Sequence, residues 1–167
     1  MAALAGGLSV ERMKRTLLLA LVLSCAHPKA EGITSESLRD LQGKLAPVAV
    51  AGKVVLLDFW ATWCEPCKTA LPTYAKLYGD LRARGFEVVA VSVDDDDADV
   101  KAFLAARPLP FTVLRDPGGA FAERMGVSLM PTSFLLGKDG KVVSRHDGFD
   151  GDTEAALRKQ IAAIIGP

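Results

Sequence analysis

The chain has 167 residues with 50% apolar content, and its 20 basic residues balance its 20 acidic ones. This length and composition suffice for one globular domain with its own core, so no second domain is needed. Nothing in the charge points to a polybasic membrane-binding surface or to nucleic acid, and we expect no nucleic-acid partner.

The first 24 residues have the organisation of a signal peptide. A mostly basic stretch at residues 11–15 precedes an apolar run at residues 16–24 that is too short to span a bilayer. Met13 stands directly before the basic pair and the leucine run, where a start is more natural than at Met1. Translation could therefore begin at Met13, with residues 1–12 as an over-extended start, and the sequence does not decide between Met1 and Met13.

Cys25 is a candidate lipidation site. The sequence Val22-Leu23-Ser24-Cys25 resembles a lipobox, in which cleavage leaves a diacylated cysteine at the new N-terminus. Lipidation would also account for the odd count of three cysteines. We predict a lipid anchor on the periplasmic side of a membrane, followed by a flexible tether over residues 25–37. The alternative is cleavage nearby, for instance after Ala30, which would give a soluble periplasmic protein.

The segment from Val54 to Trp60 predicts a central strand, because it is short and almost continuously apolar. Ahead of it, residues 46–50 predict an edge strand and residues 51–53 a turn. Asp58 is the exception in the apolar run. Loss of solvation in a buried strand raises the pKa of a carboxylate, so Asp58 can hold a proton near neutral pH. We predict that it is a proton carrier.

Cys64 and Cys67 follow this strand at a spacing that can close a small disulfide ring. Glu65 and Pro66 suit the first turn of a helix, because proline has no amide hydrogen to lose there. Cys64 then lies at a helix N-terminus, where free N–H groups and the helix dipole lower the pKa of a thiol. We predict that Cys64 is the nucleophile and that Cys67 resolves the mixed disulfide.

The sequence Trp63-Cys64-Glu65-Pro66-Cys67 after an apolar strand resembles the thioredoxin superfamily, and specifically its membrane-tethered TlpA/ResA-like branch. The resemblance extends from about Leu45 to the C-terminus. It implies a thioredoxin-like three-layer α/β fold over residues 38–167, in which helices flank a mixed sheet, with an N-terminal extension and a βα insertion.

The same resemblance implies an enzyme, a thiol-disulfide oxidoreductase with no cofactor beyond its redox-active cysteine pair. Its partners would be protein thiols and disulfides and a membrane electron donor, and we expect a monomer. Trp63, Glu65 and Pro66 would contact the substrate. Pro131 would be the cis-proline that faces the cysteine pair, and the backbone of Met130 would pair with an extended substrate segment.

The remaining elements follow a strand and helix alternation. A helix is expected from Glu65 to about Arg84, capped by Gly85. The last helix is expected from Asp152 to Ile165, capped by Asp152 or Thr153. Further strands are expected at residues 86–93, 111–114, 132–136 (directly after Pro131) and 142–146, and a short helix at residues 120–125.

We expect no metal site. The aspartates at 94–97 and 99 lack the alternating ligand pattern of a calcium loop and better suit the cap and first turn of a helix. His27 and His146 have no evident partner for zinc or for a Cys-His pair, and we expect both to be incidental.

The direction of electron flow is less determined than the chemistry. A glutamate between the cysteines disfavours the thiolate, which argues for a less oxidising pair and for a reductase. ResA-like reductases of cytochrome c maturation often carry glutamate three residues after the second cysteine and asparagine in place of Asp58. This chain has Ala70 and Asp58, which favours a general reductase. One alternative is a disulfide oxidase or isomerase with the same residues. A second, less favoured alternative is a non-enzymatic binding lipoprotein.

Overall fold

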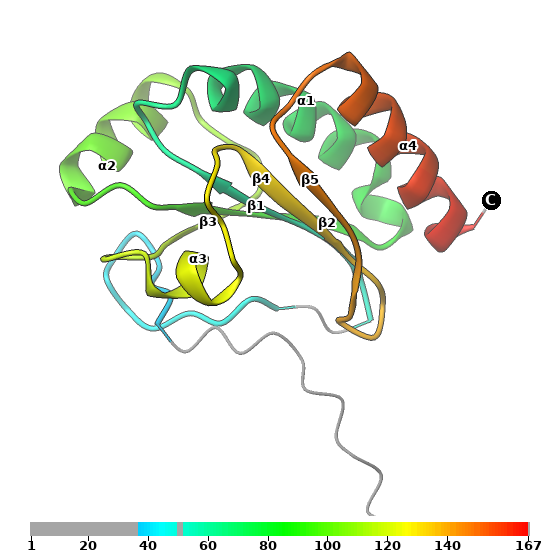
Figure 1. The fold of residues 1–167 in the computed structure, drawn as a ribbon, viewed down its shortest axis with the longest axis horizontal. Coiled ribbons are helices and arrows are strands. Elements are labelled where there is room, and N and C mark those ends of the chain that lie inside the picture. Colours follow the sequence, from blue (N-terminus) through cyan, green and yellow to red (C-terminus); the bar gives the residue numbers. More distant parts are fainter. Residues whose placement is uncertain (1–36, 50–51, 167) are drawn as a thin grey trace, which may run out of the picture. The chain divides into compact units, whose positions relative to one another are not determined.

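The computed structural model describes residues 37–49 and 52–166 (Figure 1). The predicted signal peptide, Cys25 and all but the last residue of the predicted tether lie outside the described residues. In the part that the structure describes, no helix is both long and apolar enough to cross a membrane.

Five strands form one mixed sheet in the order β3-β2-β1-β4-β5. Strands β1, β2 and β3 are parallel, β4 runs antiparallel to β1, and β5 runs antiparallel to β4. The predicted central strand is confirmed, since every residue of β1 is buried. The bounds are β1 (Val54–Trp60), β2 (Phe86–Ser92), β3 (Thr112–Arg115), β4 (Thr132–Leu136) and β5 (Val142–Asp147).

Helices cover both faces of the sheet (Figure 1). One core cluster joins alternate residues of β1, such as Leu56 and Trp60, to α1, α2 and α4. The other joins the intervening residues, such as Leu57 and Phe59, to α3 and to Leu38 and Val48. The predicted three-layer arrangement is confirmed. The helices are α1 (Glu65–Leu81), α2 (Asp97–Ala106), α3 (Ala120–Arg124) and α4 (Gly151–Ile165).

The predicted edge strand at residues 46–50 is wrong over residues 46–49, which form no strand. Arg39 makes the pairing instead, through isolated bridges to Leu45 and Arg115. Pro47 has no N–H to donate to a ladder, which explains why pairing stops before it. Val50 lies outside the described residues.

Two helix ends differ from the prediction. Helix α1 ends at Leu81 and continues as a 3-10 turn, η2 (Arg82–Arg84), before Gly85 takes the left-handed conformation at φ 87°. The cap of α4 is Asp150, whose carboxylate accepts a hydrogen bond from the Thr153 amide at 2.8 Å. The predicted capping residues, Asp152 and Thr153, lie inside the first turn.

Candidate active site

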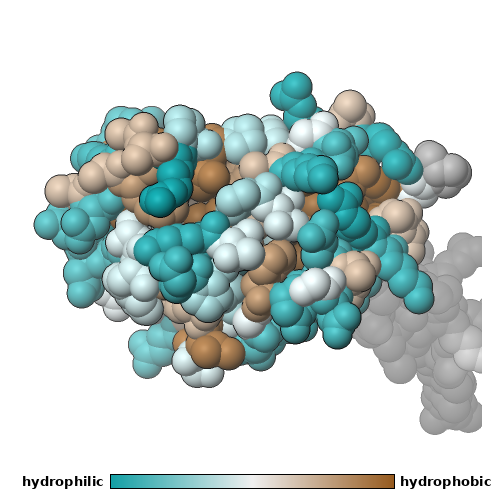
Figure 2. Space-filling model, turned by 90° about the horizontal axis from the view of Figure 1, so that it is seen from above, coloured by the Kyte–Doolittle hydropathy of each residue, from teal (hydrophilic) through white to brown (hydrophobic). Residues whose placement is uncertain are grey.

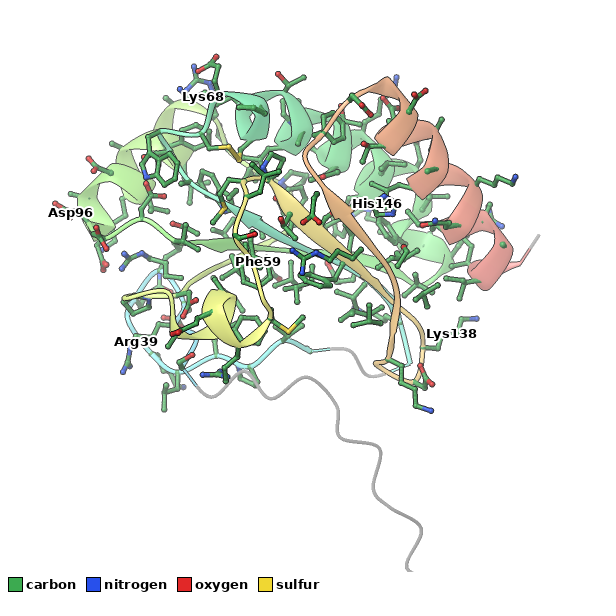
Figure 3. All side chains as sticks on the ribbon, viewed as in Figure 1. Arg39, Phe59, Lys68, Asp96, Lys138 and His146 are labelled. Atoms are coloured by element: carbon green, nitrogen blue, oxygen red, sulfur yellow. A yellow bond between two sulfur atoms is a disulfide. The ribbon has the colours of Figure 1, made fainter. Side chains whose placement is uncertain are left out.

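Cys64 and Cys67 form a disulfide at the N-terminus of α1, near the labelled Lys68 in Figure 3. Cys64 is the N-cap residue, and its sulfur accepts a hydrogen bond from the Cys67 amide at 3.2 Å. Cys64 retains 4% exposure whereas Cys67 is fully buried. The helix begins as predicted, with Glu65 and Pro66 exposed in its first turn. The site therefore has one slightly exposed cysteine and one fully buried cysteine behind it, beside free helix N–H groups.

Asp94 holds the loop that precedes the disulfide. Its buried carboxylate accepts hydrogen bonds from the Thr62 amide at 3.1 and 3.0 Å, and from the Thr62 hydroxyl at 2.6 Å. The Ser92 hydroxyl also donates to it at 2.7 Å. Sequence reasoning missed this role because it assigned the aspartate run to helix capping. That assignment is right only for Asp96, which caps α2, and for the first-turn residues Asp97 and Asp99.

Asp58 lies fully buried on β1, at the middle of the sheet. Burial raises the pKa of its carboxyl well above the usual range, and the nearby Tyr74 hydroxyl acts in the opposite direction. No carboxylate oxygen of Asp58 makes a hydrogen bond of regular geometry. Burial likewise raises the pKa of Tyr74, with a further increase from the charge of Asp58. The predicted direction of the Asp58 shift is therefore confirmed, and its physical cause is desolvation.

Pro131 lies at the same end of the sheet as the disulfide. The motif leaves β1 after Trp60, and the β4 residue Thr132 pairs with Phe59 at that end. The Met130–Pro131 bond is cis, and Pro131 is buried. Thr132 fixes the loop before it, since its hydroxyl lies within hydrogen-bonding distance of two acceptors, the Leu129 carbonyl at 2.7 Å and the Asp147 carboxylate at 2.8 Å.

Exposed apolar side chains flank both parts of this site. Trp63 is 68% exposed beside Cys64, and Leu129 is 54% exposed in the loop that leads to Pro131. Met130 is partly buried and packs against both core clusters. On the side of α1, α2 and α4, surface apolar residues lie in separate patches between hydrophilic ones (Figure 2). Contact with a partner would therefore rely on a few local side chains.

The acidic residues that the structure describes do not group into a metal site, and His146 has structural partners. Within residues 37–49 and 52–166, no three His, Cys, Asp or Glu side chains are grouped so that they could hold a metal ion. The His146 ring nitrogen Nε2 lies 3.2 Å from both the Ser144 hydroxyl and the Gln160 side-chain oxygen. His27 lies outside the described residues.

Comparisons with known proteins agree with this geometry. The model of the Redoxin family matches residues 34–161. The thiol-disulfide oxidoreductase ResA of Bacillus thuringiensis subsp. konkukian is 41% identical over 110 residues, which make up 65% of this chain and 64% of that protein. The chain thus spans less than two thirds of the length of that relative.

Solved structures show the same fold. A thioredoxin-like protein from Porphyromonas gingivalis superposes with a TM-score of 0.70 at 31% identity, covering 80% of this chain and 91% of that one. The exposed lipoprotein thioredoxin Etrx1 of Streptococcus pneumoniae superposes with a TM-score of 0.65 at 28% identity, covering 75% of this chain and 96% of that one.

Proposed function

The chain belongs to the Redoxin family as a ResA-like protein of the thioredoxin superfamily, and from this premise we propose that it is a thiol-disulfide oxidoreductase. The observation that carries the proposal is the Cys64–Cys67 disulfide at the start of α1, which directly follows the strand that carries the buried Asp58. A cysteine at the N-terminus of a helix supplies a nucleophile, and a buried acid of raised pKa supplies a proton acceptor and donor.

The reaction in the reducing direction has two steps. The Cys64 thiolate attacks a disulfide of the partner, forming a mixed disulfide and releasing one partner sulfur with the electron pair. Cys67 then gives its proton to Asp58 and attacks Cys64, which releases the second partner sulfur and closes the Cys64–Cys67 bond. The two partner sulfurs take up protons from solution. The chain is oxidised by two electrons and must be reduced again by a donor.

The partner contacts that we propose involve two stretches. The exposed Trp63, Glu65 and Pro66 surround Cys64, and the Met130 backbone precedes the buried Pro131. An extended segment of a protein substrate could pair with that backbone as an added strand.

We place the enzyme outside the cytoplasm, anchored through lipidated Cys25 and served by a membrane electron donor. The lipobox-like sequence supports this, and so does the likeness to Etrx1, which is an exposed lipoprotein. Labelled palmitate incorporated at Cys25 would support the anchor. A mature N-terminus further along the chain would instead indicate the soluble periplasmic form.

The activity can be tested on the full chain carrying Cys25→Ser, which retains only the two motif cysteines. Reduction of insulin disulfides with dithiothreitol as the terminal reductant should be accelerated by this protein and not by the additional Cys64→Ser variant. Binding to a partner that needs Cys64, without electron transfer, would instead favour a binding lipoprotein.

A further inference from the structure

A row of three polar side chains crosses the sheet from its centre to its edge. The strand register pairs Asp58 of β1 with Ser133 of β4, and Ser133 with His146 of the edge strand β5. Directly paired residues on antiparallel strands have Cβ atoms about 4.5–5.5 Å apart. Consecutive members of the row are therefore neighbours if their side chains share a face of the sheet.

All three side chains lie on the face covered by α1 and α4. Side chains alternate between faces along a strand, and Asp58 stands between Leu56 and Trp60, which both belong to the core cluster on that face. Ser133 alternates in the same way with Leu135. His146 is directed toward α4 (Figure 3), where it meets Gln160 at 3.2 Å.

The inner members of the row lack regular hydrogen-bond partners. Asp58 and Ser133 are fully buried or nearly so, and neither the Asp58 oxygens nor the Ser133 hydroxyl makes a regular hydrogen bond. The same is true of the Tyr74 hydroxyl, which reaches this place from α1 and interacts with both Asp58 and Ser133. Buried polar groups are rarely left unpaired. Small rotations of the two hydroxyls, or one bridging water, would join the three groups into a network.

Few other groups on this face can exchange protons. Strand β2 places Ala90 opposite Asp58, and α4 contributes apolar side chains such as Leu157 and Ile161. Arg158 of α4 pairs with Glu154 and Asp80. Among the described residues that pack here, the titratable groups are therefore few. They are Asp58, Tyr74, His146 and, in the reduced protein, Cys67.

We propose that Ser133 and His146 act as positioning residues of a proton path that connects Asp58 to solvent, with Tyr74 beside its inner end. The proposal rests on the proposed function. Asp58 must be deprotonated to take the proton of Cys67, and bulk solvent does not reach it directly because it is fully buried. The hydroxyls pass its proton outward, and the half-buried His146 passes it on to solvent, because one imidazole nitrogen can accept a proton while the other donates one.

The path can be tested by single-turnover oxidation of the reduced Cys25→Ser chain with excess oxidised glutathione. Acid quenching and mass measurement separate the Cys64–glutathione mixed disulfide from the closed Cys64–Cys67 form. Ser133→Ala and His146→Gln should slow closure by roughly tenfold or more at pH 7, so that the mixed disulfide accumulates. Imidazole in the buffer should restore the His146→Gln rate, which a merely structural role would not produce.

Two matched variants make the result specific. Ser133→Thr keeps the hydroxyl and should keep the wild-type closure rate. Val143→Ala changes an exposed side chain of the same strand and leaves the row intact, so it should also close at the wild-type rate. If Ser133→Ala and His146→Gln close the Cys64–Cys67 disulfide at the wild-type rate, and imidazole does not change that rate, the proposed path is wrong. The oxidoreductase function is then unaffected. If the wild-type chain forms neither the mixed disulfide nor the closed Cys64–Cys67 bond, the proposed function itself fails.

Discussion

Asp94 and Thr62 are joined by three hydrogen bonds, two from the Thr62 amide and one from its hydroxyl. The bonds connect the end of β2 to the loop between β1 and the disulfide. Because Asp94 is buried and Thr62 lies two residues before Cys64, the contact fixes the backbone from which the nucleophile projects. The apolar strand and the helix start thus need a third, long-range element to define the site.

Asp94→Ala should destabilise the fold strongly. The substitution leaves the Thr62 amide and the Ser92 hydroxyl without their buried acceptor, which should cost about 2–4 kcal/mol of the free energy of unfolding. Urea unfolding measures this loss. The exposed neighbour Asp95 provides the control, because Asp95→Ala should change the free energy by less than about 0.5 kcal/mol. Equal effects of the two substitutions would show that the contact with Thr62 contributes nothing.

The pH dependence of stability should reveal Asp58. Burial raises its pKa, so the folded chain keeps this proton to a higher pH than the unfolded chain does. The stability that the neutral carboxyl contributes is complete below the unfolded pKa of about 3.9 and is lost as the pH rises through the folded pKa. Asp58→Asn has no proton to lose. Between the unfolded and the folded pKa of Asp58, the free energy of unfolding of Asp58→Asn relative to wild type should therefore increase with pH, by up to about 1.4 kcal/mol per pH unit.

Denaturant unfolding at a series of pH values measures that advantage, and Asp147→Asn supplies the control of opposite sign. Hydrogen bonds from Arg145 and then Thr132 lower the pKa of Asp147, so its stabilising contribution is present above the unfolded pKa and lost as the pH falls. An Asp58→Asn advantage that stays constant from acid to alkaline pH would mean that Asp58 does not titrate differently on folding.

Asp150 should matter more to α4 than the two residues that sequence alone favoured as caps. Its carboxylate accepts hydrogen bonds from the Thr153 amide and hydroxyl, both at 2.8 Å. Asp150→Ala should therefore lower the thermal unfolding midpoint, and Asp152→Ala should lower it less. The Thr153 amide bond also lowers the pKa of Asp150, so the difference between the variants should shrink as the pH falls through that folded pKa. A larger loss from Asp152→Ala would restore the original assignment.

The two cysteines should behave differently when each is replaced by serine in the Cys25→Ser chain. Cys67→Ser leaves Cys64 able to attack but removes the resolving thiol, so it should accumulate mixed disulfides with partner proteins. Cys64→Ser should form none. Non-reducing electrophoresis of extracts treated with acid and then with a thiol-blocking reagent distinguishes the two. If mixed disulfides accumulated with Cys64→Ser instead, Cys67 would be the nucleophile and Cys64 the resolving cysteine.

The sequence predicts the site where one local pattern determines it. The continuous apolar run of β1, Pro66 in the first turn and the buried carboxylate of Asp58 each follow from residue type and spacing, and the structure has all three. Contacts between segments that are distant in the sequence could not be predicted from residue type and spacing. Asp94 is one aspartate in a run of four. Only its contact with Thr62, which forms when the chain folds, distinguishes it from the other three.

His146 illustrates the same limit at the other edge of the sheet. Its neighbour Ser133 is 13 positions away in the sequence, and the register of β4 on β5 brings them together. The edge strand expected at residues 46–50 is wrong over residues 46–49 for the same reason, because Arg39 makes the pairing that local composition assigned to a later segment.

The equilibrium reduction potential of the Cys64–Cys67 pair tests the proposed reductase most directly. The reduced and oxidised forms of the Cys25→Ser chain can be distinguished by the fluorescence of the neighbouring Trp63 in glutathione or dithiothreitol buffers. We predict a potential near that of thioredoxin, about −270 mV, as expected for a reductase of protein disulfides. A potential near about −120 mV would contradict this and identify an oxidase that introduces disulfides.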